Sequence, residues 1–352
     1  MKKMLALLLA LVMVLSLAAC ASSQPATTDA AASTETAETT ETTEAAEPAA
    51  EESAEAPAES GKTYTVGVCQ LVQHEALDAA TQGFIDALKE ELGDAVTVDV
   101  QNASGDSVNC GTIVNGFVSK GVDLIMANAT PALTAAVSAT ADIPILGTSI
   151  TAYGVALDID DFNGTVGGNV SGTSDLADLQ AQAQMILDWF PETKTVGLLF
   201  CSAEPNSRYQ IDEVRKALEA QGVTCEEFAF TDSNDVSSVT QKAADFSDVV
   251  YIPTDNTAAS NTEAIANVLI PAGVPAVCGE EGLCRGCGVA TLSISYYDLG
   301  VTTGKMAAKI LKGEADISTM PVEYTDATPK YNASVCEQLG ITPLDGYEAI
   351  DG

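Results

Sequence analysis

Short apolar runs and longer amphipathic segments alternate along the chain from residue 63 onward. The apolar runs are bounded by polar and turn residues, which is typical of buried strands in parallel sheets. Between them, apolar residues recur every three or four positions, as on one face of a helix. The predicted strands are 64–70, 96–101, 124–128, 143–148, 195–201, 224–230, 249–253, 276–278 and 289–294; the predicted helices include 76–92, 131–139, 176–190, 207–221 and 260–272.

This alternation predicts an α/β chain with two doubly wound parallel-sheet lobes, each covered by helices on both faces. The two sets of strands meet near Gly172, in a segment rich in Gly, Asn, Ser and Thr that we interpret as the first crossover. A late helix, 297–312, is predicted to return to the first set, and a final strand near 321–325 to join the second. We therefore assign residues 62–172 plus 296–318 to an N-terminal lobe and 173–295 plus 319–352 to a C-terminal lobe.

The first residues have the anatomy of an export signal. Two lysines precede a short apolar run that ends in Leu17-Ala18-Ala19-Cys20, which resembles a bacterial lipobox. We expect 1–19 to be a lipoprotein signal peptide and Cys20 to be lipidated, which would place the protein outside the cytoplasm on a lipid anchor. The acidic stretch that follows Cys20, up to residue 61, holds ten acids and no Lys or Arg, so we expect a disordered tether there.

Composition limits the class of partner. The net charge of −35 would repel nucleic acid and anionic membrane surfaces, so neither is expected to bind. Nine cysteines are present, and Cys284 and Cys287 form a C-x₂-C motif. Zinc usually needs a second such pair, and the single histidine, His74, is far away in sequence, so a strained disulfide or free thiols are favoured over a metal site. No metal and no cofactor are predicted.

Polar side chains follow almost every predicted strand. In open parallel sheets, ligands bind beyond the carboxyl ends of the strands, so these residues are the candidate site. Helix N-termini there offer N–H groups to an anion, while Asp255 and Glu280 could hold a cation, which together suits a zwitterion such as an amino acid. The same residue types also cap helices, so the interpretation depends on their repeated placement. The candidates are Gln70, His74, Thr130, Thr148, Ser149, Thr173, Ser174, Asp175, Glu204, Asn206, Asp255, Asn256 and Glu280.

Enzyme motifs are not found in the sequence: it has no G-x-S-x-G elbow, no H-E-x-x-H and no P-loop. No nucleophile pairs with His74 on sequence grounds. We therefore predict a binding protein and no catalytic residue.

Several stretches resemble one family. They are 73–78 (QHEALD), 129–132 (ATPA), 171–175 (SGTSD), 251–257 (YIPTDNT) and 296–300 (YYDLG), all in the order and spacing of ABC-importer binding proteins assigned to tryptophan and tyrosine, in the type I periplasmic-binding superfamily. The resemblance spans residues 62 to 345. It implies two hinged lobes joined by three crossovers, with a small ligand between them, an ABC permease as partner and a monomeric protein.

Under this resemblance Asp255 is expected to pair with the ligand ammonium, and Thr130, Ser149, Thr173 and Ser174 to take its carboxylate. Three departures from the family stand out: Glu75 replaces a proline after the histidine, Ala152-Tyr153 replaces Asp-Pro, and cysteines follow Glu281. An aromatic amino acid is the favoured ligand. The alternative is a surface sensor or adhesin that uses the same clamp for signalling or for a host partner.

Overall fold

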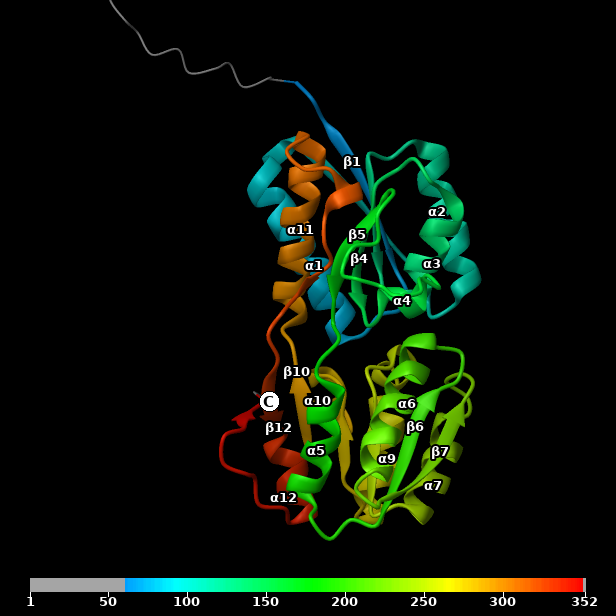
Figure 1. Ribbon diagram of the computed structural model, residues 1–352, viewed down its shortest axis with the longest axis vertical. Coiled ribbons are helices and arrows are strands. Elements are labelled where there is room, and N and C mark those ends of the chain that lie inside the picture. Colours follow the sequence, from blue (N-terminus) through cyan, green and yellow to red (C-terminus); the bar gives the residue numbers. More distant parts are fainter. Residues whose placement is uncertain (1–60, 351–352) are drawn as a thin grey trace, which may run out of the picture. The chain divides into compact units, whose positions relative to one another are not determined.

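The computed structural model describes residues 61–350. The predicted signal peptide, Cys20 and nearly all of the predicted tether lie outside this range. Within it, the strands form two separate sheets, one of six strands and one of seven (Figure 1). The predicted two-lobe α/β fold is confirmed.

The first sheet is parallel throughout, with strand order β11-β5-β4-β3-β1-β2. Its central strands are fully buried because helices cover both faces, which explains why they are apolar without alternation. Its strands are β1 (Tyr64–Gln70), β2 (Val96–Asn102), β3 (Leu124–Asn128), β4 (Ile145–Ile150), β5 (Val170–Ser174) and β11 (Glu323–Tyr324).

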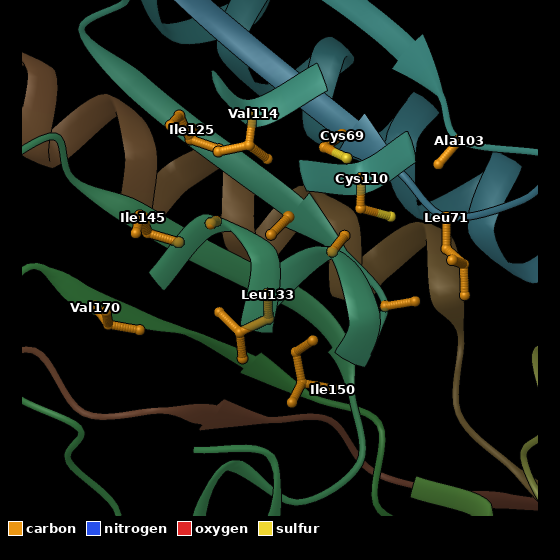
Figure 2. Close-up of a cluster of buried hydrophobic side chains, with 14 of the residues drawn as sticks. Cys69, Leu71, Ala103, Cys110, Val114, Ile125, Leu133, Ile145, Ile150 and Val170 are labelled. Atoms are coloured by element: carbon orange, nitrogen blue, oxygen red, sulfur yellow. The ribbon is translucent and has the colours of Figure 1, made fainter. Parts of the chain in front are cut away.

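Helices α2 (Ser107–Lys120) and α3 (Thr130–Ala139) cover one face of this sheet, and α1 (Glu75–Leu92) and α11 (Tyr296–Lys312) cover the other (Figure 1). Figure 2 shows the core beneath α2 and α3, where Val114 and Leu133 lie against the strands. A short helix, α4 (Tyr153–Ala156), follows β4, and 3₁₀ turns occupy Gly93–Ala95 and Ile317–Thr319.

Helix α11 returns to the first lobe as predicted and packs closely on α1. Glycines make this approach possible: a Cβ on Gly83 would lie 2.1 Å from the carbonyl oxygen of Tyr297, and one on Gly300 would lie 2.0 Å from that of Ala80. Both distances are far below van der Waals contact, so only glycine fits at these positions.

The second sheet has the order β13-β12-β10-β9-β8-β6-β7 and is parallel except between β10 and β12. Its strands are β6 (Thr195–Cys201), β7 (Thr224–Phe230), β8 (Val249–Ile252), β9 (Ala276–Cys278), β10 (Ala290–Ser293), β12 (Thr328–Tyr331) and β13 (Glu348–Ala349). Its helices are α5 (Leu179–Trp189), α6 (Pro205–Glu219), α7 (Val236–Phe246), α8 (Asn256–Ala259), α9 (Thr262–Ala272), α10 (Glu281–Cys287) and α12 (Ala333–Leu339).

The last strand of the first sheet corrects one prediction. The segment near 321–325 was expected in the second sheet, but β11 pairs in parallel with β5 through Glu323–Thr173 and Tyr324–Ser174. β5 itself extends to Ser174, so the first sheet takes in residues 173–174, which the predicted boundary gave to the second lobe. A two-residue strand with exposed side chains has no hydrophobic pattern that could reveal its partner.

The chain thus passes between the two sheets three times: after β5, after β10 and after β11. Across residues 61–350 we find no helix that is long and apolar enough to span a membrane.

Candidate functional site

A small cavity lies where the strand ends of the two lobes meet. The first lobe contributes His74, Leu77, Ser149, Thr151 and Asp175, and α11 contributes Tyr296; the second contributes Asn206, Thr254, Asp255, Asn256, Ala259 and Glu280. Its free volume of about 10 Å³ matches a single water molecule. The lobes are therefore closed on one another in this conformation.

Loop and helix geometry at the strand ends directs these side chains into the cavity. Ser149, near the end of β4, has φ of +56°, a left-handed conformation that is uncommon for serine. Asp175 directly follows β5, and His74 is the N-cap residue of α1. Backbone strain of this kind tends to occur at functional sites.

A chain of hydrogen bonds sets the tautomer of His74. Glu204 accepts from Asn256 Nδ2 at 2.6 Å, so the Asn256 amide oxygen faces the histidine. His74 Nε2 lies 3.3 Å from that oxygen and must donate to it. Burial lowers the pKa of His74, so the ring is neutral and its Nδ1 is left as an acceptor.

One carboxylate oxygen of Asp175 accepts a hydrogen bond, and the other has no hydrogen-bond partner. Tyr296 donates its hydroxyl to Oδ2 at 2.9 Å, while Oδ1 is buried without a hydrogen-bond partner. Burial raises the pKa of Asp175 to about 6, against the opposing effect of the nearby Tyr296 and Thr151 hydroxyls. At neutral pH the group is a carboxylate that lacks a cationic neighbour among the residues lining the cavity.

Four residues of the cavity lining carry a buried polar atom without a partner: His74 Nδ1, Ser149 Oγ, Asp175 Oδ1 and Asn206 Oδ1. Unpaired buried polar atoms are rare and costly in folded proteins. Their convergence on one cavity marks it as the candidate ligand site.

The carboxylates of the second lobe are bonded to their own backbone. Asp255 accepts from the N–H groups of Cys201 at 2.6 Å and Ala258 at 2.8 Å, and so caps α8. Glu280 caps α10 through the N–H groups of Gly282 and Leu283. Burial raises the pKa of Glu280 to about 7; burial and the neighbouring Glu204 raise that of Asp255.

The structure brings seven of the thirteen sequence candidates to the cavity and leaves six outside its lining. Gln70 bonds Asp78 and Thr81 of α1, at 2.6 Å each. Thr148 and Thr173 join Thr303 in a buried hydroxyl network with distances of 2.8–3.1 Å. The six outside are Gln70, Thr130, Thr148, Thr173, Ser174 and Glu204. Glu204 still acts on the site through Asn256.

Five residues line the cavity without being among the thirteen sequence candidates: Leu77, Thr151, Thr254, Ala259 and Tyr296. Apolar residues on helices look like core, so the polar strand-end criterion could not select Leu77 or Ala259. Tyr296 did carry a signal, because it belongs to one of the motifs that resemble the family.

Two of the family departures have structural explanations. Tyr153 is 1% exposed, and its hydroxyl donates to the carbonyl oxygens of Gly147 at 3.0 Å and Thr173 at 3.2 Å. These hydrogen bonds link β4 to β5. Glu75, on α1, pairs with Arg285 on α10 at 3.0 Å. That ion pair joins the two lobes beside the cavity.

The cysteines after Glu281, which are the third departure from the family pattern, are buried. Cys284 and Cys287 are at most 1% exposed, and both are free thiols, as is Cys278. Within residues 61–350 there is no group of three or more His, Cys, Asp or Glu side chains placed to hold a metal ion.

Comparison with known proteins identifies the family. The model of the family "ABC transporter substrate binding protein" matches residues 65–346. A curated tyrosine-binding protein of Clostridioides difficile (strain R20291) is 32% identical over 276 residues, which covers 77% of this chain and 79% of that protein.

Two solved structures are each 32% identical to the chain and cover 82% of it. One is an ABC domain of Streptococcus pneumoniae in complex with L-Trp, with a TM-score of 0.78 over 100% of that chain. The other is the ligand-free, open form of a substrate-binding protein with adhesive properties from Clostridium difficile, with a TM-score of 0.63 over 99% of that chain. The chain belongs to the family of ABC transporter substrate-binding proteins, with the type I periplasmic-binding fold.

Proposed function

We propose that the protein captures an amino acid, with aromatic ones favoured, between its lobes and delivers it to an ABC permease. The observation that carries this proposal is the set of three unpaired acceptors in the cavity: His74 Nδ1, Asp175 Oδ1 and Asn206 Oδ1. A primary ammonium has three N–H donors, so it can satisfy all three atoms.

Charge supports an ammonium over other donors. Asp175 supplies a buried negative charge, and no Lys or Arg is found among the lining residues, all of which lie within 61–350. A buried carboxylate is stabilised by a cation at hydrogen-bond distance. Asp175, with its open oxygen, is a better partner for the ammonium than Asp255, whose oxygens already accept backbone N–H groups.

The remaining lining suits the rest of an amino acid. The unpaired hydroxyl of Ser149 can donate to a carboxylate. Leu77, Ala259 and the ring of Tyr296 form an apolar wall for a side chain. An aromatic side chain is favoured by the relatives, which are described as tyrosine-binding and as bound to L-Trp.

Closure of the lobes fits a capture cycle. The cavity has room for about one water molecule, so a ligand can enter only if the lobes separate. Contacts that cross from one lobe to the other, such as His74 to Asn256 and Glu75 to Arg285, would then break and re-form.

The membrane anchor is a further part of the proposal. We infer from the Leu17-Ala18-Ala19-Cys20 motif that the mature chain is lipidated at Cys20 and stands outside the cytoplasm. Metabolic labelling with a clickable palmitate analogue would label the protein and not its Cys20→Ala variant. Equal labelling of both would reject the anchor.

Adhesion is a second candidate, because one relative of known structure is described as having adhesive properties. Adhesion would not require a ligand enclosed between the lobes. Binding to host cells that is unchanged by saturating ligand would favour a surface separate from the cavity, whereas no binding would leave capture as the sole function proposed.

A thermal-shift screen against the twenty amino acids tests the proposal. A ligand at a hundred times its Kd adds about 2.7 kcal/mol of stability, which corresponds to roughly 5–10 °C in a domain of this size. We expect tryptophan or tyrosine to raise the melting temperature and indole-3-propionate, which lacks the ammonium, to leave it unchanged. A shift with sugars and with no amino acid would overturn the ligand class.

A further inference from the structure

Cys69 and Cys110 form a buried pair in the first lobe. Cys69 lies near the end of β1 and Cys110 in α2, and both are 0% exposed. Figure 2 shows the two side chains next to each other in the core between the sheet and α2. The two thiols also influence each other: the pKa of Cys69 is raised chiefly by Cys110, and that of Cys110 is lowered chiefly by Cys69.

Cys110 is the more acidic thiol of this pair. It is the fourth residue of α2, and its N–H bonds the carbonyl of Asp106, the N-cap residue. The amides of a helix N-terminus stabilise negative charge. The neighbouring Cys69 lowers the pKa of Cys110, while burial and the charge of Asp106 oppose this shift, and the pKa of Cys69 is raised, so Cys110 is the better nucleophile of the two.

The thiols of the second lobe differ. Burial raises the pKa of Cys278 and of Cys284, so both remain protonated. Cys287 donates its S–H to the carbonyl of Leu283, within its own helix. Since the thiolate is the reacting species, Cys278 and Cys284 are poor nucleophiles.

Access to Cys110 comes from its own helix end. Residues 104–109, just before it, are all exposed, and Val108 is 73% exposed. Opening of this first helical turn would bring Cys110 to solvent without disturbing the sheet, because helix ends open locally at low cost.

We propose that Cys69 and Cys110 are a redox pair that closes to a disulfide when the exported protein meets a disulfide-bearing oxidant. The Cys110 thiolate attacks one sulfur of the oxidant, forms a mixed disulfide and expels one thiolate. The Cys69 proton passes to that thiolate, and the Cys69 sulfur then attacks Cys110 and expels the second. The second expelled thiolate takes from solvent the proton that Cys110 released when it ionised, so in total the two cysteines lose two electrons and two protons and the oxidant disulfide becomes two thiols.

Peptide mapping tests the proposal directly, because trypsin separates the two cysteines. Cys69 is the single cysteine of peptide 63–89, and Cys110 that of peptide 90–120. The purified full-length protein would be treated with oxidised glutathione, denatured, alkylated with iodoacetamide without reductant, and digested. We expect these two peptides to be joined and to lack the alkyl label. Recovery of both as separate alkylated peptides would overturn the proposal.

Stability gives an independent readout. The disulfide would close a loop of about 40 residues, so it should raise the melting temperature on the order of 10 °C, and dithiothreitol should remove the gain. The Cys110→Ser variant should lose this response, while Cys225→Ser, which alters a half-buried thiol outside the pair, should keep it. A dithiothreitol response that survives in Cys110→Ser would contradict the assignment.

Discussion

The two sides of the cavity use buried acids in opposite ways. On the first-lobe side, Asp175 leaves one oxygen unpaired and receives its one hydrogen bond from Tyr296. On the second-lobe side, Asp255 and Glu280 bond the backbone N–H groups of their own lobe. All three are at most 5% exposed, and burial raises the pKa of each.

Burial and a shifted pKa therefore do not distinguish a binding acid from a structural one. What differs is the open oxygen, because a buried oxygen without any hydrogen bond gains more from a ligand donor than one that already accepts a backbone N–H. Asp255 holds the segments next to Asn206 and Asn256, Glu280 caps α10, and Asp175 keeps an oxygen for the ligand. Measurements of ligand binding, folding stability and pH dependence test this contrast.

The largest effect is expected from Asp175→Asn. Loss of the charge partner should weaken binding of the amino acid about 100- to 1,000-fold, because removing one member of a buried charge pair costs about 3–4 kcal/mol. Asp255→Asn, the matched change across the cavity, should alter the Kd less than about tenfold. Isothermal titration calorimetry would measure both. A larger loss in Asp255→Asn than in Asp175→Asn would reverse the contrast.

Folding stability should respond in the opposite order. Asp255→Ala removes a helix cap and leaves the N–H groups of Cys201 and Ala258 without partners, at a cost of roughly 3 kcal/mol. The ligand-free melting temperature should fall by roughly 6–12 °C. Asp175→Asn should shift it by less than about 3 °C, since its open oxygen makes no bond to lose. Equal losses in the two variants would refute the distinction.

Acid should weaken binding through Asp175. The ammonium binds the carboxylate form, and burial raises the pKa of Asp175 to about 6 in the free protein. Below that pH the carboxyl is protonated, so the Kd measured by titration should rise about tenfold between pH 7.5 and pH 5. Without ligand the sign is reversed: a raised pKa means that stability from this group declines as pH rises through 4 to 6. Asp175→Asn should flatten the binding profile, and a flat profile in the unsubstituted protein would exclude this role.

The smallest effect concerns the contact between lobes. Glu75→Gln removes the ion pair with Arg285, which is half exposed and so contributes less than about 1 kcal/mol. We expect a two- to fourfold higher Kd, seen mainly as faster dissociation in stopped-flow measurements, and no difference at high salt. Glu91→Gln breaks a comparable ion pair to Lys312 inside the first lobe and is the control. Equal effects of the two changes would show that Glu75 does not act on closure.

The clear hydrophobic patterns of the buried strands made most of the fold predictable from the sequence. Strands such as β1, β3 and β6 have the predicted bounds, since their apolar runs end at polar residues. Helices α2 and α7 were not among the helices named from the sequence; α2 contains Gly111 and Gly116, which weaken a helical pattern. The assignment of β11 failed because its two exposed residues have no pattern.

The candidate site was predictable in location but not in detail. Strand ends pointed to the region around Ser149, Asp175 and Asp255, which the structure brings to one cavity. Which acid keeps a free oxygen depends on hydrogen bonds such as Cys201 N–H to Asp255, across 54 positions of sequence. No local pattern reports contacts at that separation.

The central claim is that the ligand ammonium binds the open oxygen of Asp175. A crystal structure of the protein with bound tryptophan tests it most directly. The account predicts the ammonium nitrogen about 2.8–3.0 Å from Asp175 Oδ1, with His74 Nδ1 and Asn206 Oδ1 as its other acceptors. An ammonium bound instead to Asp255 or Glu280, with Asp175 Oδ1 still unpaired, would contradict it.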